Sequence, residues 1–492
     1  MREIGFINSW SKSNIFLFNW IQILVCLGTQ TLFSQSIPFT RHVIDLNFPG
    51  IQYIKIIDLD GDNDLDVVGG SEITPYSSSH GIAWWRNDGS SPINWTKFVI
   101  DSSFVHVMSV DAAYIDADSN LDIIASSWQL NQVAWWKNGG VPTQGWIKYI
   151  VQSGYGNAHD AQCEDIDEDG DIDIITASSN PGSIDICYNE NKLQPIWNCV
   201  QIDPNFSGAK SVLIRDLDLD SDLDIVGTAD VANDIAWWEN TGINSQAWSK
   251  IIIENNFIGS CFANAIDINE DLKLDIIGSA WSSNQVAYWL CNDLSTNSWT
   301  KYSVTSSLQT SVRAFGDDFD KDGDIDLVAV GKSPGKLVVF INDHFNWTEQ
   351  VLESNFEGGS ALAIEDLDKD GDVDIIAGAG VLGDLYWWEN ETINTSVEDQ
   401  TGLLQNNFCL KQNYPNPFNQ TTKFSFTIPQ RSNVSLIVYD VQGKVIRTIL
   451  SEEKPPGNYE VLFDAVGLSS GIYYYQLIID RYAKTNKIIL MK

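Results

Sequence analysis

Residues 165–175 read DIDEDGDIDII. If they formed one regular strand, most of the carboxylates would lie on one face of a sheet, where like charges repel. The apolar pair at 174–175 instead predicts that a buried strand begins at the end of the run. We therefore interpret the acidic part as a turn whose charge calls for a compensating cation.

The acidic run is one of seven related runs, spaced about 50 residues apart, and repeats of this length are typical of solenoids and propellers. The runs begin at Asp58, Tyr114, Asp165, Asp216, Asp267, Asp318 and Asp366. Each is followed by an apolar, mostly aromatic run such as IAWW or VAWW; these runs end at Trp85, Trp136, Cys187, Trp238, Trp289, Phe340 and Trp388. A third marker, a short strand similar to WTKFVID, follows all but the last run, and the missing copy appears at the front as FTRHVID, residues 39–45.

Each repeat therefore predicts four strands, which match one blade of a β-propeller. The displaced copy predicts that the N-terminal strand completes the last blade and removes an exposed edge, which an open solenoid would not need. We predict an all-β protein: a seven-bladed β-propeller over residues 36–392, a polar linker over 393–407 and a smaller β-sandwich over 408–492.

The acidic turn has the ligand spacing of a calcium loop. Counted from Asp165 as position 1, carboxylates occupy positions 1, 3, 5, 7 and 9, and Gly170 at position 6 permits a sharp turn. This matches the first part of an EF-hand loop, and flexible oxygen ligands favour Ca²⁺ over Mg²⁺. The EF-hand also has flanking helices and a Glu at position 12, where this chain has Thr176 and strands. The alternative, a merely solvated acidic turn, leaves the repulsion unexplained in seven copies.

Five loops carry the full set of carboxylates, and we predict five to six Ca²⁺ sites. The predicted ligands are Asp58, Asp60, Asp62, Asp64 and Asp66; Asp165, Asp167, Asp169, Asp171 and Asp173; Asp216, Asp218, Asp220, Asp222 and Asp224; Asp318, Asp320, Asp322, Asp324 and Asp326; and Asp366, Asp368, Asp370, Asp372 and Asp374. A sixth loop keeps Asp267, Asn269, Asp271 and Asp275 but has Leu272 and Lys273 at positions 6 and 7, so its occupancy stays open. The loop at Tyr114 lacks the first ligand and is predicted to be metal-poor.

The acidic runs, followed by strands of the type AWWxN, resemble FG-GAP or VCBS-type repeats such as those of the integrin α-chain propeller. The resemblance covers roughly residues 45–392, and the Asp loop is its specific part. It implies Ca²⁺ in the loops that join the first and second strands of each blade. The phrase Phe-Gly…Gly-Ala-Pro is absent, so an integrin-like ligand does not transfer.

The C-terminal part has a different pattern. YPNPFN at 414–419 is followed by alternating strands such as LIVYDVQGKVI (436–446), a run of the type GNY…FD…LSSGIYYYQL (457–477), and a terminal KIILMK. These residues predict a small Ig-like β-sandwich. They closely resemble the type A C-terminal sorting domain of the Bacteroidota type IX secretion system. The resemblance implies that the type IX machinery is a partner and that the chain is secreted or placed on the outer cell surface.

The N-terminus agrees with export. Arg2 and Lys12 precede an apolar run from Ile15 to Leu27, which predicts a cleaved secretory signal peptide over residues 1–35. The alternative, a membrane anchor, needs about 20 apolar residues, so we predict no transmembrane segment in the mature chain. The net charge of −37 argues against nucleic acid and anionic membranes as partners. Cys187 and Cys199 flank a predicted hairpin and either pair after export or stay as buried thiols.

No catalytic motif is present, so binding or adhesion to an extracellular glycan or protein is the preferred function. The expected ligand face is opposite the calcium loops, where Trp128 and Trp281 occupy matching positions. The alternative for both residues is packing between blades. The alternative is an enzyme, a polysaccharide lyase or hydrolase. The groups expected near its channel, which are also candidates for ligand contact, are His106, His159, Lys210 and Arg313.

Overall fold

The computed structural model describes residues 36–72, 80–241, 248–392 and most of 409–491, with 412, 414, 417, 429–430, 440–443, 456 and 480–481 left out. The predicted signal peptide (1–35) and linker (393–407) lie outside the described residues. Apart from one short 3₁₀ helix, η1 (Leu294–Thr296), the regular elements of the described residues are all strands, and the prediction of an all-β protein is confirmed. They fall into two compact units, one before and one after residue 393.

The described residues of the N-terminal unit form seven four-stranded antiparallel sheets; six come from one repeat each, and the seventh combines the last repeat with the N-terminal strand. The first strands are β2 (Ile51–Ile57), β6 (Val107–Ala113), β10 (Ala158–Glu164), β14 (Ala209–Arg215), β18 (Ser260–Ile266), β22 (Ser311–Asp317) and β26 (Gly359–Glu365). The second strands are β3 (Asp66–Ser71), β7 (Asp122–Ser127), β11 (Asp173–Ser178), β15 (Asp224–Ala229), β19 (Asp275–Ala280), β23 (Asp326–Lys332) and β27 (Asp374–Ala379).

The third strands carry the aromatic runs: β4 (Ile82–Asn87), β8 (Gln132–Lys137), β12 (Ser183–Asn189), β16 (Asp234–Asn240), β20 (Gln285–Asp293), β24 (Gly335–Asp343) and β28 (Asp384–Asn390). The fourth strands are β5 (Trp95–Asp101), β9 (Ile147–Ser153), β13 (Trp197–Asp203), β17 (Trp248–Glu254), β21 (Ser298–Thr305), β25 (Asn346–Glu353) and, for the last sheet, β1 (Phe39–Asp45).

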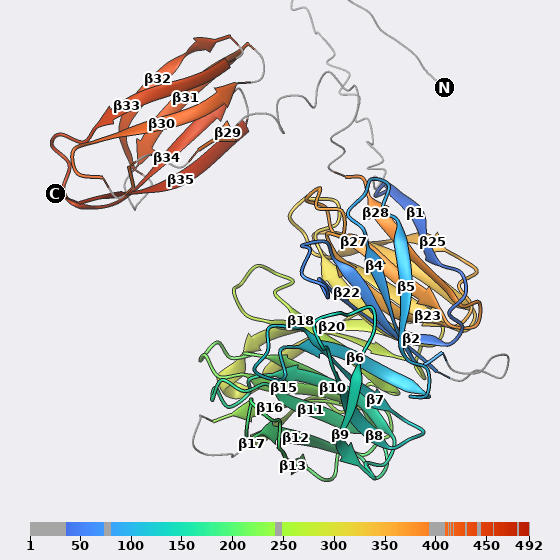
Figure 1. The fold of residues 1–492 in the computed structure, drawn as a ribbon. Coiled ribbons are helices and arrows are strands. Elements are labelled where there is room, and N and C mark those ends of the chain that lie inside the picture. The colour runs from blue at the N-terminus through green and yellow to red at the C-terminus, as the bar shows by residue number, and fades with distance from the viewer. Residues whose placement is uncertain are drawn as a thin grey trace, which may run out of the picture. The chain divides into compact units, whose positions relative to one another are not determined.

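The N-terminal strand closes the unit as the displaced marker predicts. Strand β1 pairs antiparallel with β28, so the first and last strands of the unit lie side by side (Figure 1). The first strands contact one another in cyclic order, from β2 to β6 and onward to β26, which contacts β2 again. This arrangement is propeller-like: the first strands surround the centre and the fourth strands lie outermost.

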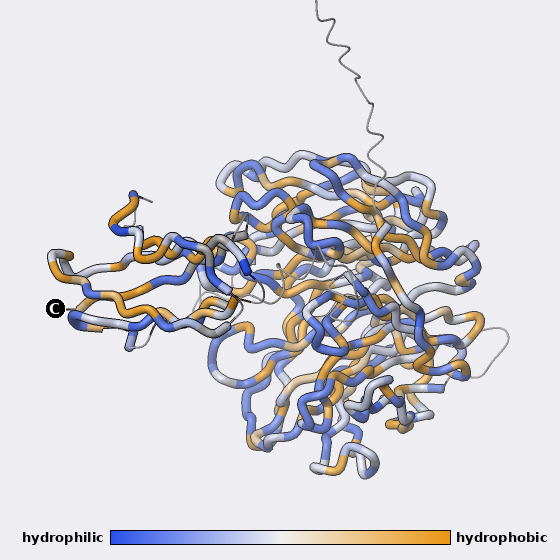
Figure 2. The backbone as a smooth tube through the Cα atoms, turned by 90° about the horizontal axis from the view of Figure 1, so that it is seen from above, coloured by the Kyte–Doolittle hydropathy of each residue, from blue (hydrophilic) through white to orange (hydrophobic). Residues whose placement is uncertain are grey.

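The core lies between neighbouring sheets. Trp84, Trp85, Trp136, Trp238 and Trp289 are at most 2% exposed, as expected for strands covered on both faces. Along the chain, hydrophobic segments alternate with hydrophilic turns throughout the unit (Figure 2). Burying each of these indoles removes about 200 Å² of mostly apolar surface from water, so the aromatic strands contribute strongly to the stability of the core.

The lysine of the third marker links neighbouring sheets. Lys250 on β17 contacts Asp203, the last residue of β13 in the preceding sheet, at 2.7 Å, and lies 4.5 Å from the ring centre of Phe206. Lys97 contacts Asp45, and Lys301 contacts Glu254, in the same way. A cation held between an aromatic face and a carboxylate is favourable when it is partly desolvated, so this residue type recurs in the marker.

Every first strand carries a β-bulge near its start. The register shifts span the residues Gln52, Met108, His159, Lys210, Cys261, Val312 and Ser360. Bulges re-aim side chains and are common at the rims of barrels and near sites. They lie at the end of each first strand that is opposite the acidic loop, so they mark a second ring on that side of the unit.

The structure pairs Cys187 with Cys199 in a disulfide between β12 and β13 of the third sheet. The two residues are direct partners in the antiparallel register. Cys163, Cys261 and Cys291 are free. Of the two alternatives for Cys187 and Cys199, the disulfide is therefore the one formed.

The described residues of the C-terminal unit form two sheets. One contains β29 (Cys409–Leu410), β30 (Thr421–Ile428) and β33 (Gly457–Asp464), and the other contains β31 (Ser432–Tyr439), β32 (Val445–Lys454), β34 (Gly471–Ile479) and β35 (Tyr482–Leu490). Phe424, Phe463 and Tyr475 stack in the core between them. Asn416, within the YPNPFN run, accepts a hydrogen bond from the backbone N–H of Ile489, so this run is tied to the last strand.

Candidate metal loops and the opposite face

The acidic loops all join the first strand of a sheet to its second strand, and the aspartate at position 9 is the first residue of the second strand. The seven position-9 residues, Asp66, Asp122, Asp173, Asp224, Asp275, Asp326 and Asp374, are at most 1% exposed. The local sequence explains this placement, because the apolar residues that follow enter the core at once. The prediction of a turn followed by a buried strand is confirmed.

The buried carboxylate at position 9 organises its loop. In the third sheet, Asp173 accepts hydrogen bonds from the backbone N–H of Ile166 (3.2 Å) and of Asn189 (2.8 Å), which ties the loop to the end of the aromatic strand. Asp326 is held in the same way by Phe319 and Asn342. Burial nevertheless raises the pKa of Asp173 to about 7 and that of Asp326 to about 8. A nearby cation would favour the ionised form of both.

The first position supplies unsatisfied oxygen. One carboxylate oxygen of Asp165 accepts the backbone N–H of Gly170, whereas its other oxygen is buried without a hydrogen-bond partner. Asp366 has the same orphaned oxygen in the last loop. Buried carboxylate oxygens without a partner are costly, and a hard cation is the group that they fit.

The third and ninth positions complete the group. One oxygen from each of three residues lies within 4.8 Å of the others in the sets Asp165, Asp167 and Asp173; Asp216, Asp218 and Asp224; and Asp318, Asp320 and Asp326. Positions 1, 3 and 9 of these loops are thus brought together as predicted. In the first loop the set is Asp58, Asp60 and Asp62. The donor set in each case is carboxylate oxygen alone, which suits Ca²⁺.

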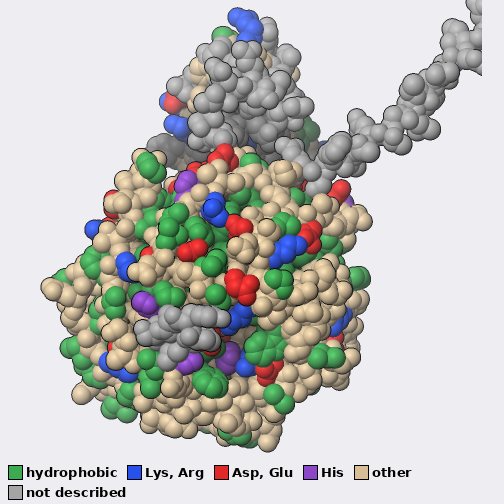
Figure 3. Space-filling model, turned by 90° about the vertical axis from the view of Figure 1, so that its right-hand side faces the viewer, with side chains coloured by type: hydrophobic (Ala, Val, Ile, Leu, Met, Phe, Trp, Pro, Cys, Tyr) green, Lys and Arg blue, Asp and Glu red, His purple; other side chains and the backbone are tan. Residues whose placement is uncertain are grey.

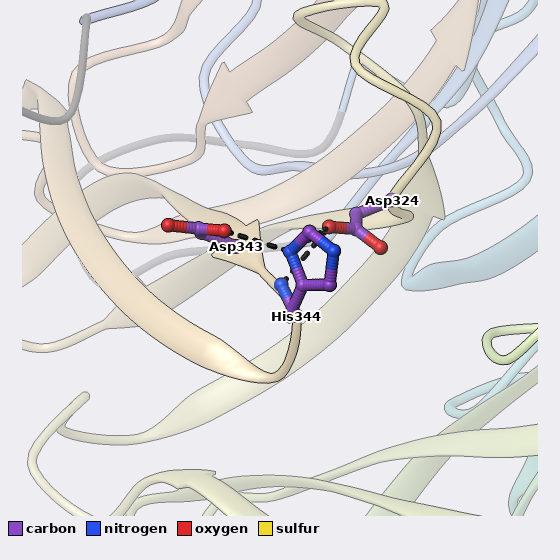
Figure 4. A group of neighbouring side chains, drawn as sticks. All are labelled: Asp324, Asp343 and His344. Carbon is purple, nitrogen blue, oxygen red and sulfur yellow. Dashed lines mark hydrogen bonds and ion pairs between the residues drawn. The ribbon is translucent and has the colours of Figure 1, made fainter.

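Position 7 has another role. Asp171 accepts the backbone N–H of Lys192, and Asp324 accepts that of His344, so these side chains hold the turn that follows the third strand. Figure 4 shows His344 between Asp324 and Asp343; its Nδ1 lies 2.8 Å from Asp343 and 3.4 Å from Asp324. The pKa of His344 is raised, first by its hydrogen bond to Asp343. We therefore interpret this cluster as a set of contacts that stabilises the turn after the third strand.

In two loops, the residue after the aromatic pair is a cation that contacts the acidic side chains; in the loop at Asp267, Lys273 contacts Asp271 at 2.7 Å. Arg86, the residue after the aromatic pair of β4, donates to Asp60 at 2.5 Å and to Asp62 at 2.9 Å. Lys137, at the same position of β8, contacts Asp116 closely and Asp118 at 2.9 Å in the loop at Tyr114. Sequence reasoning missed both residues, because nothing in the linear order of the repeat links this position to the loop.

The predicted ligand face lies at the other end of the sheets. Trp128 follows β7, is 41% exposed, and its ring centre lies 5.7 Å from that of His106. His106 Nδ1 lies 3.9 Å from Glu72, which also contacts Lys332 at 3.4 Å. These four residues come from different strand ends, and Glu72 and Lys332 were not predicted. On the face drawn in Figure 3, positive and negative side chains are interspersed with hydrophobic ones.

The other candidates are more deeply held. His159 lies within β10 and not before it as expected, because it is a bulge residue; its Nδ1 contacts the backbone oxygen of Lys210 at 3.1 Å. The pKa of His159 lies well below its usual value, owing first to burial and then to the positive charge of Lys210. Lys210 in turn lies 4.8 Å above the ring of Trp281 and 3.4 Å from Asp230. Trp281 is thus a half-buried packing residue here.

All seven first strands line a central cavity of about 360 Å³. Its polar lining includes Lys55 and Asp111, which pair at 2.7 Å, together with Arg215 and Glu365. Arg313 packs over the ring of Tyr53 at 4.2 Å and donates to the backbone oxygen of Ser360. Arg313 therefore joins three first strands, and its contacts are those of a structural residue.

Known families match two parts of the chain. Residues 318–377 are an FG-GAP-like repeat, and residues 412–491 are a secretion system C-terminal sorting domain. Both resemblances seen in the sequence are thereby confirmed. The sorting domain is of the type IX system, so the chain is exported to the cell surface or secreted. No sequence among the curated proteins matches the chain.

Several solved structures are similar in fold. One is an Agrocybe aegerita lectin that recognises non-reducing terminal N-acetylglucosamine (17% identity over 63% of this chain and 82% of that chain, TM-score 0.44). A second is BBS1N in complex with ARL6DN (10% identity, 73% and 97%, TM-score 0.48). A third is PorZ, a surface component of the type IX system of Porphyromonas gingivalis (13% identity, 91% and 60%, TM-score 0.44). At these TM-scores no ligand transfers from them to this chain.

None of the helices among the described residues is long and apolar enough to cross a membrane.

Proposed function

We propose that this exported chain is a calcium-loaded, seven-bladed FG-GAP-type propeller that binds an extracellular glycan or protein, joined to an Ig-like sorting domain. The sheets, closed by β1 and arranged around one centre, support seven blades. The observation that carries the calcium assignment is the orphaned, buried oxygen of Asp165, which lies in a loop whose carboxylates at positions 1, 3 and 9 converge. Bound Ca²⁺ supplies positive charge there and no chemistry.

The residues of the third loop that hold Ca²⁺ in this proposal are Asp165, Asp167 and Asp173, and the equivalent residues serve in the loops at Asp216, Asp318 and Asp366. Without an ion, their carboxylates repel one another. With an ion, each loop fixes the start of its buried second strand. The metal therefore stabilises the scaffold and does not itself contact the ligand, because the expected ligand face is at the other end of the sheets.

Trp128 supports ligand binding at that other end. Its exposed indole provides an apolar platform, and His106 and Glu72 place polar groups at its edge. Aromatic surface with a few polar groups is the usual make-up of small-ligand sites, including those for sugar rings. We propose Trp128 as the central contact and Trp281, held beneath Lys210, as a packing residue.

We also propose that the chain binds without catalysis. His159 donates from Nδ1 to the backbone oxygen of Lys210 and is buried in its neutral form, which leaves it poorly placed as a general base. The guanidinium of Arg313 packs on the ring of Tyr53 and donates to the backbone oxygen of Ser360, so its contacts are structural. Screening the exported chain against algal and plant polysaccharides tests this: release of unsaturated or reducing ends would establish an enzyme instead.

The binding proposal is tested on a glycan array with three proteins. The parent chain should bind a defined set of glycans, and Trp128→Ala should lose that signal. Tyr114→Ala is the matched control, because Tyr114 is an exposed aromatic residue at the acidic-loop end of the same sheet. Equal binding by the parent chain and Trp128→Ala would remove Trp128 from the site, and no binding by any of the three would remove the glycan as ligand.

A further inference from the structure

The residue after the aromatic pair takes two opposite kinds of charge in this chain. The seven residues at this position are Arg86, Lys137, Tyr188, Glu239, Leu290, Ile341 and Glu389. Arg86 and Lys137 are cations on the third strand of their sheets. Each contacts the acidic loop that joins the first and second strands of the same sheet. Glu389 instead approaches Asp368 of the last loop. Burial raises the pKa of Asp368, and the negative charge of Glu389 raises it further. This position is therefore a cation in two repeats, a carboxylate in two and uncharged in the other three.

The first loop is partly neutralised by such contacts, although one buried oxygen of Asp60 has no hydrogen-bond partner. Asp58 accepts the backbone N–H groups of residues 61, 62 and 63. Asp60 and Asp62 receive Arg86, and Asp64 receives Lys369 at 2.9 Å from the neighbouring loop. The four acidic side chains of the turn thus have partners from the protein.

The third and fourth loops differ. Among the described residues, carboxylates of both loops accept backbone N–H groups, but no Lys or Arg side chain pairs with a carboxylate of either loop. The ammonium group of Lys192 reaches the third loop but donates to the backbone oxygen of Gly170. The residue after the aromatic pair is Tyr188 in the third sheet and Glu239 in the fourth. Three carboxylates converge in each of these loops at positions 1, 3 and 9, whereas positions 1, 3 and 5 converge in the first loop. The third and fourth loops therefore differ from the first in the converging set and in the compensating charge.

We propose that Arg86 and Lys137 are built-in counter-cations that take the place of the divalent ion in the first and second loops. A guanidinium bound to two carboxylates supplies the charge and the hydrogen bonds that an ion would supply. The divalent ions are then confined to the loops at Asp165, Asp216, Asp318 and Asp366. This inference rests on the proposed calcium binding and lowers the expected number of well-formed sites from five to four, with the loop at Asp267 unaffected by it.

The test measures the number of Ca²⁺ ions bound per full-length chain, by equilibrium dialysis followed by metal analysis. Arg86→Gln should bind one ion more than the parent chain, because Asp58, Asp60, Asp62 and Asp66 are then free to hold it. Arg86→Lys keeps a cation and should gain none. Lys336→Gln, which removes a lysine paired with Glu349 outside the acidic loops, is the charge-matched control and should also gain none. An unchanged number in Arg86→Gln would overturn the proposal.

A second measurement decides the matter if Arg86→Gln does not fold. Asp60→Asn in the otherwise unchanged chain should leave the number of bound ions as it is, whereas Asp167→Asn should remove one. Loss of an ion in Asp60→Asn would show that the first loop holds metal despite Arg86 and would contradict the inference. If the parent chain binds no Ca²⁺ at all, the proposed calcium binding itself fails, which is a different result from equal ion numbers in parent and variant.

Discussion

The ammonium group of Lys250 lies 2.7 Å from the carboxylate of Asp203, although the two residues belong to neighbouring sheets and are far apart in the chain. The aromatic faces of Phe206 and Trp238 flank the same ammonium group at 4.5 and 5.3 Å. Asp203 has 10% of its side chain exposed, so the pair is partly withdrawn from water. This contact is one of a series that joins sheet to sheet around the unit.

We predict that Lys250→Met destabilises the protein by about 1–3 kcal/mol, because it leaves the buried Asp203 without its charged partner. Combining it with Asp203→Asn should restore part of the loss, since the unpaired carboxylate is then gone. Urea unfolding of the two single variants and the double variant measures the coupling. Strictly additive losses would mean that the pair does not couple the two sheets.

Asparagines in the turns before the aromatic strands provide a second link. Asn131, Asn233 and Asn284 all have positive φ, and their side-chain oxygens accept the backbone N–H of Asn157, Gly259 and Thr310 in the next sheet. We predict that Asn284→Ala lowers the free energy of unfolding by about 1–2 kcal/mol, through both the lost hydrogen bond and the strain of a positive φ. Asn284→Gly tolerates the same φ and should lose less. Equal losses in the two variants would show that backbone strain contributes nothing.

The disulfide between Cys187 and Cys199 gives a third prediction. It closes a short loop of sequence separation 12, for which restriction of the unfolded chain is worth about 2–3 kcal/mol. Cys187→Ala combined with Cys199→Ala should lower the thermal midpoint accordingly, and a mild reductant should have that effect on the parent chain alone. A parent chain whose midpoint is indifferent to reductant would argue that the pair is not closed in the exported protein.

Burial of His159 predicts a dependence of stability on pH. Its pKa is lowered in the folded protein, so the folded state resists protonation that the unfolded state accepts below about 6.5. The contribution of neutral His159 to the free energy of unfolding is fully present above about pH 6.5. It is lost as the pH falls, by up to about 1.4 kcal/mol per pH unit. His159→Gln should unfold with a shallower dependence between pH 6.5 and 5. Identical slopes for parent and variant would place His159 in contact with water.

The sequence predicted the parts of this structure that depend on local patterns. The acidic turn, the buried strand that begins at position 9, the aromatic strand and the N-terminal closing strand each leave a signal within one repeat or in its register. The convergence of Asp165, Asp167 and Asp173 follows from the same spacing. What the sequence could not place were contacts between segments that are distant along the chain. Lys250 with Asp203 and Lys369 with Asp64 depend on which sheets become neighbours.

Arg86 and Lys137 are an intermediate case. They stand at one fixed position of the repeat. Lys137 contacts the loop in which Tyr114 replaces the aspartate that would be the first ligand. Comparing the charge at this position with the quality of each loop is a signal that could have indicated the contact. The bulge at His159 had no comparable signal, because an inserted residue does not alter the pattern of a largely buried strand enough to be seen.

The most direct test of the central claim, that the acidic loops hold divalent cations which stabilise the propeller, is thermal unfolding of the full-length chain with Ca²⁺ and with excess chelator. Ligands that bind only the folded state raise its stability, about 2.7 kcal/mol per site at a hundredfold excess over Kd. Several filled loops should therefore lower the midpoint sharply on chelation, and added Ca²⁺ should restore it. An unchanged midpoint in excess chelator would contradict the account.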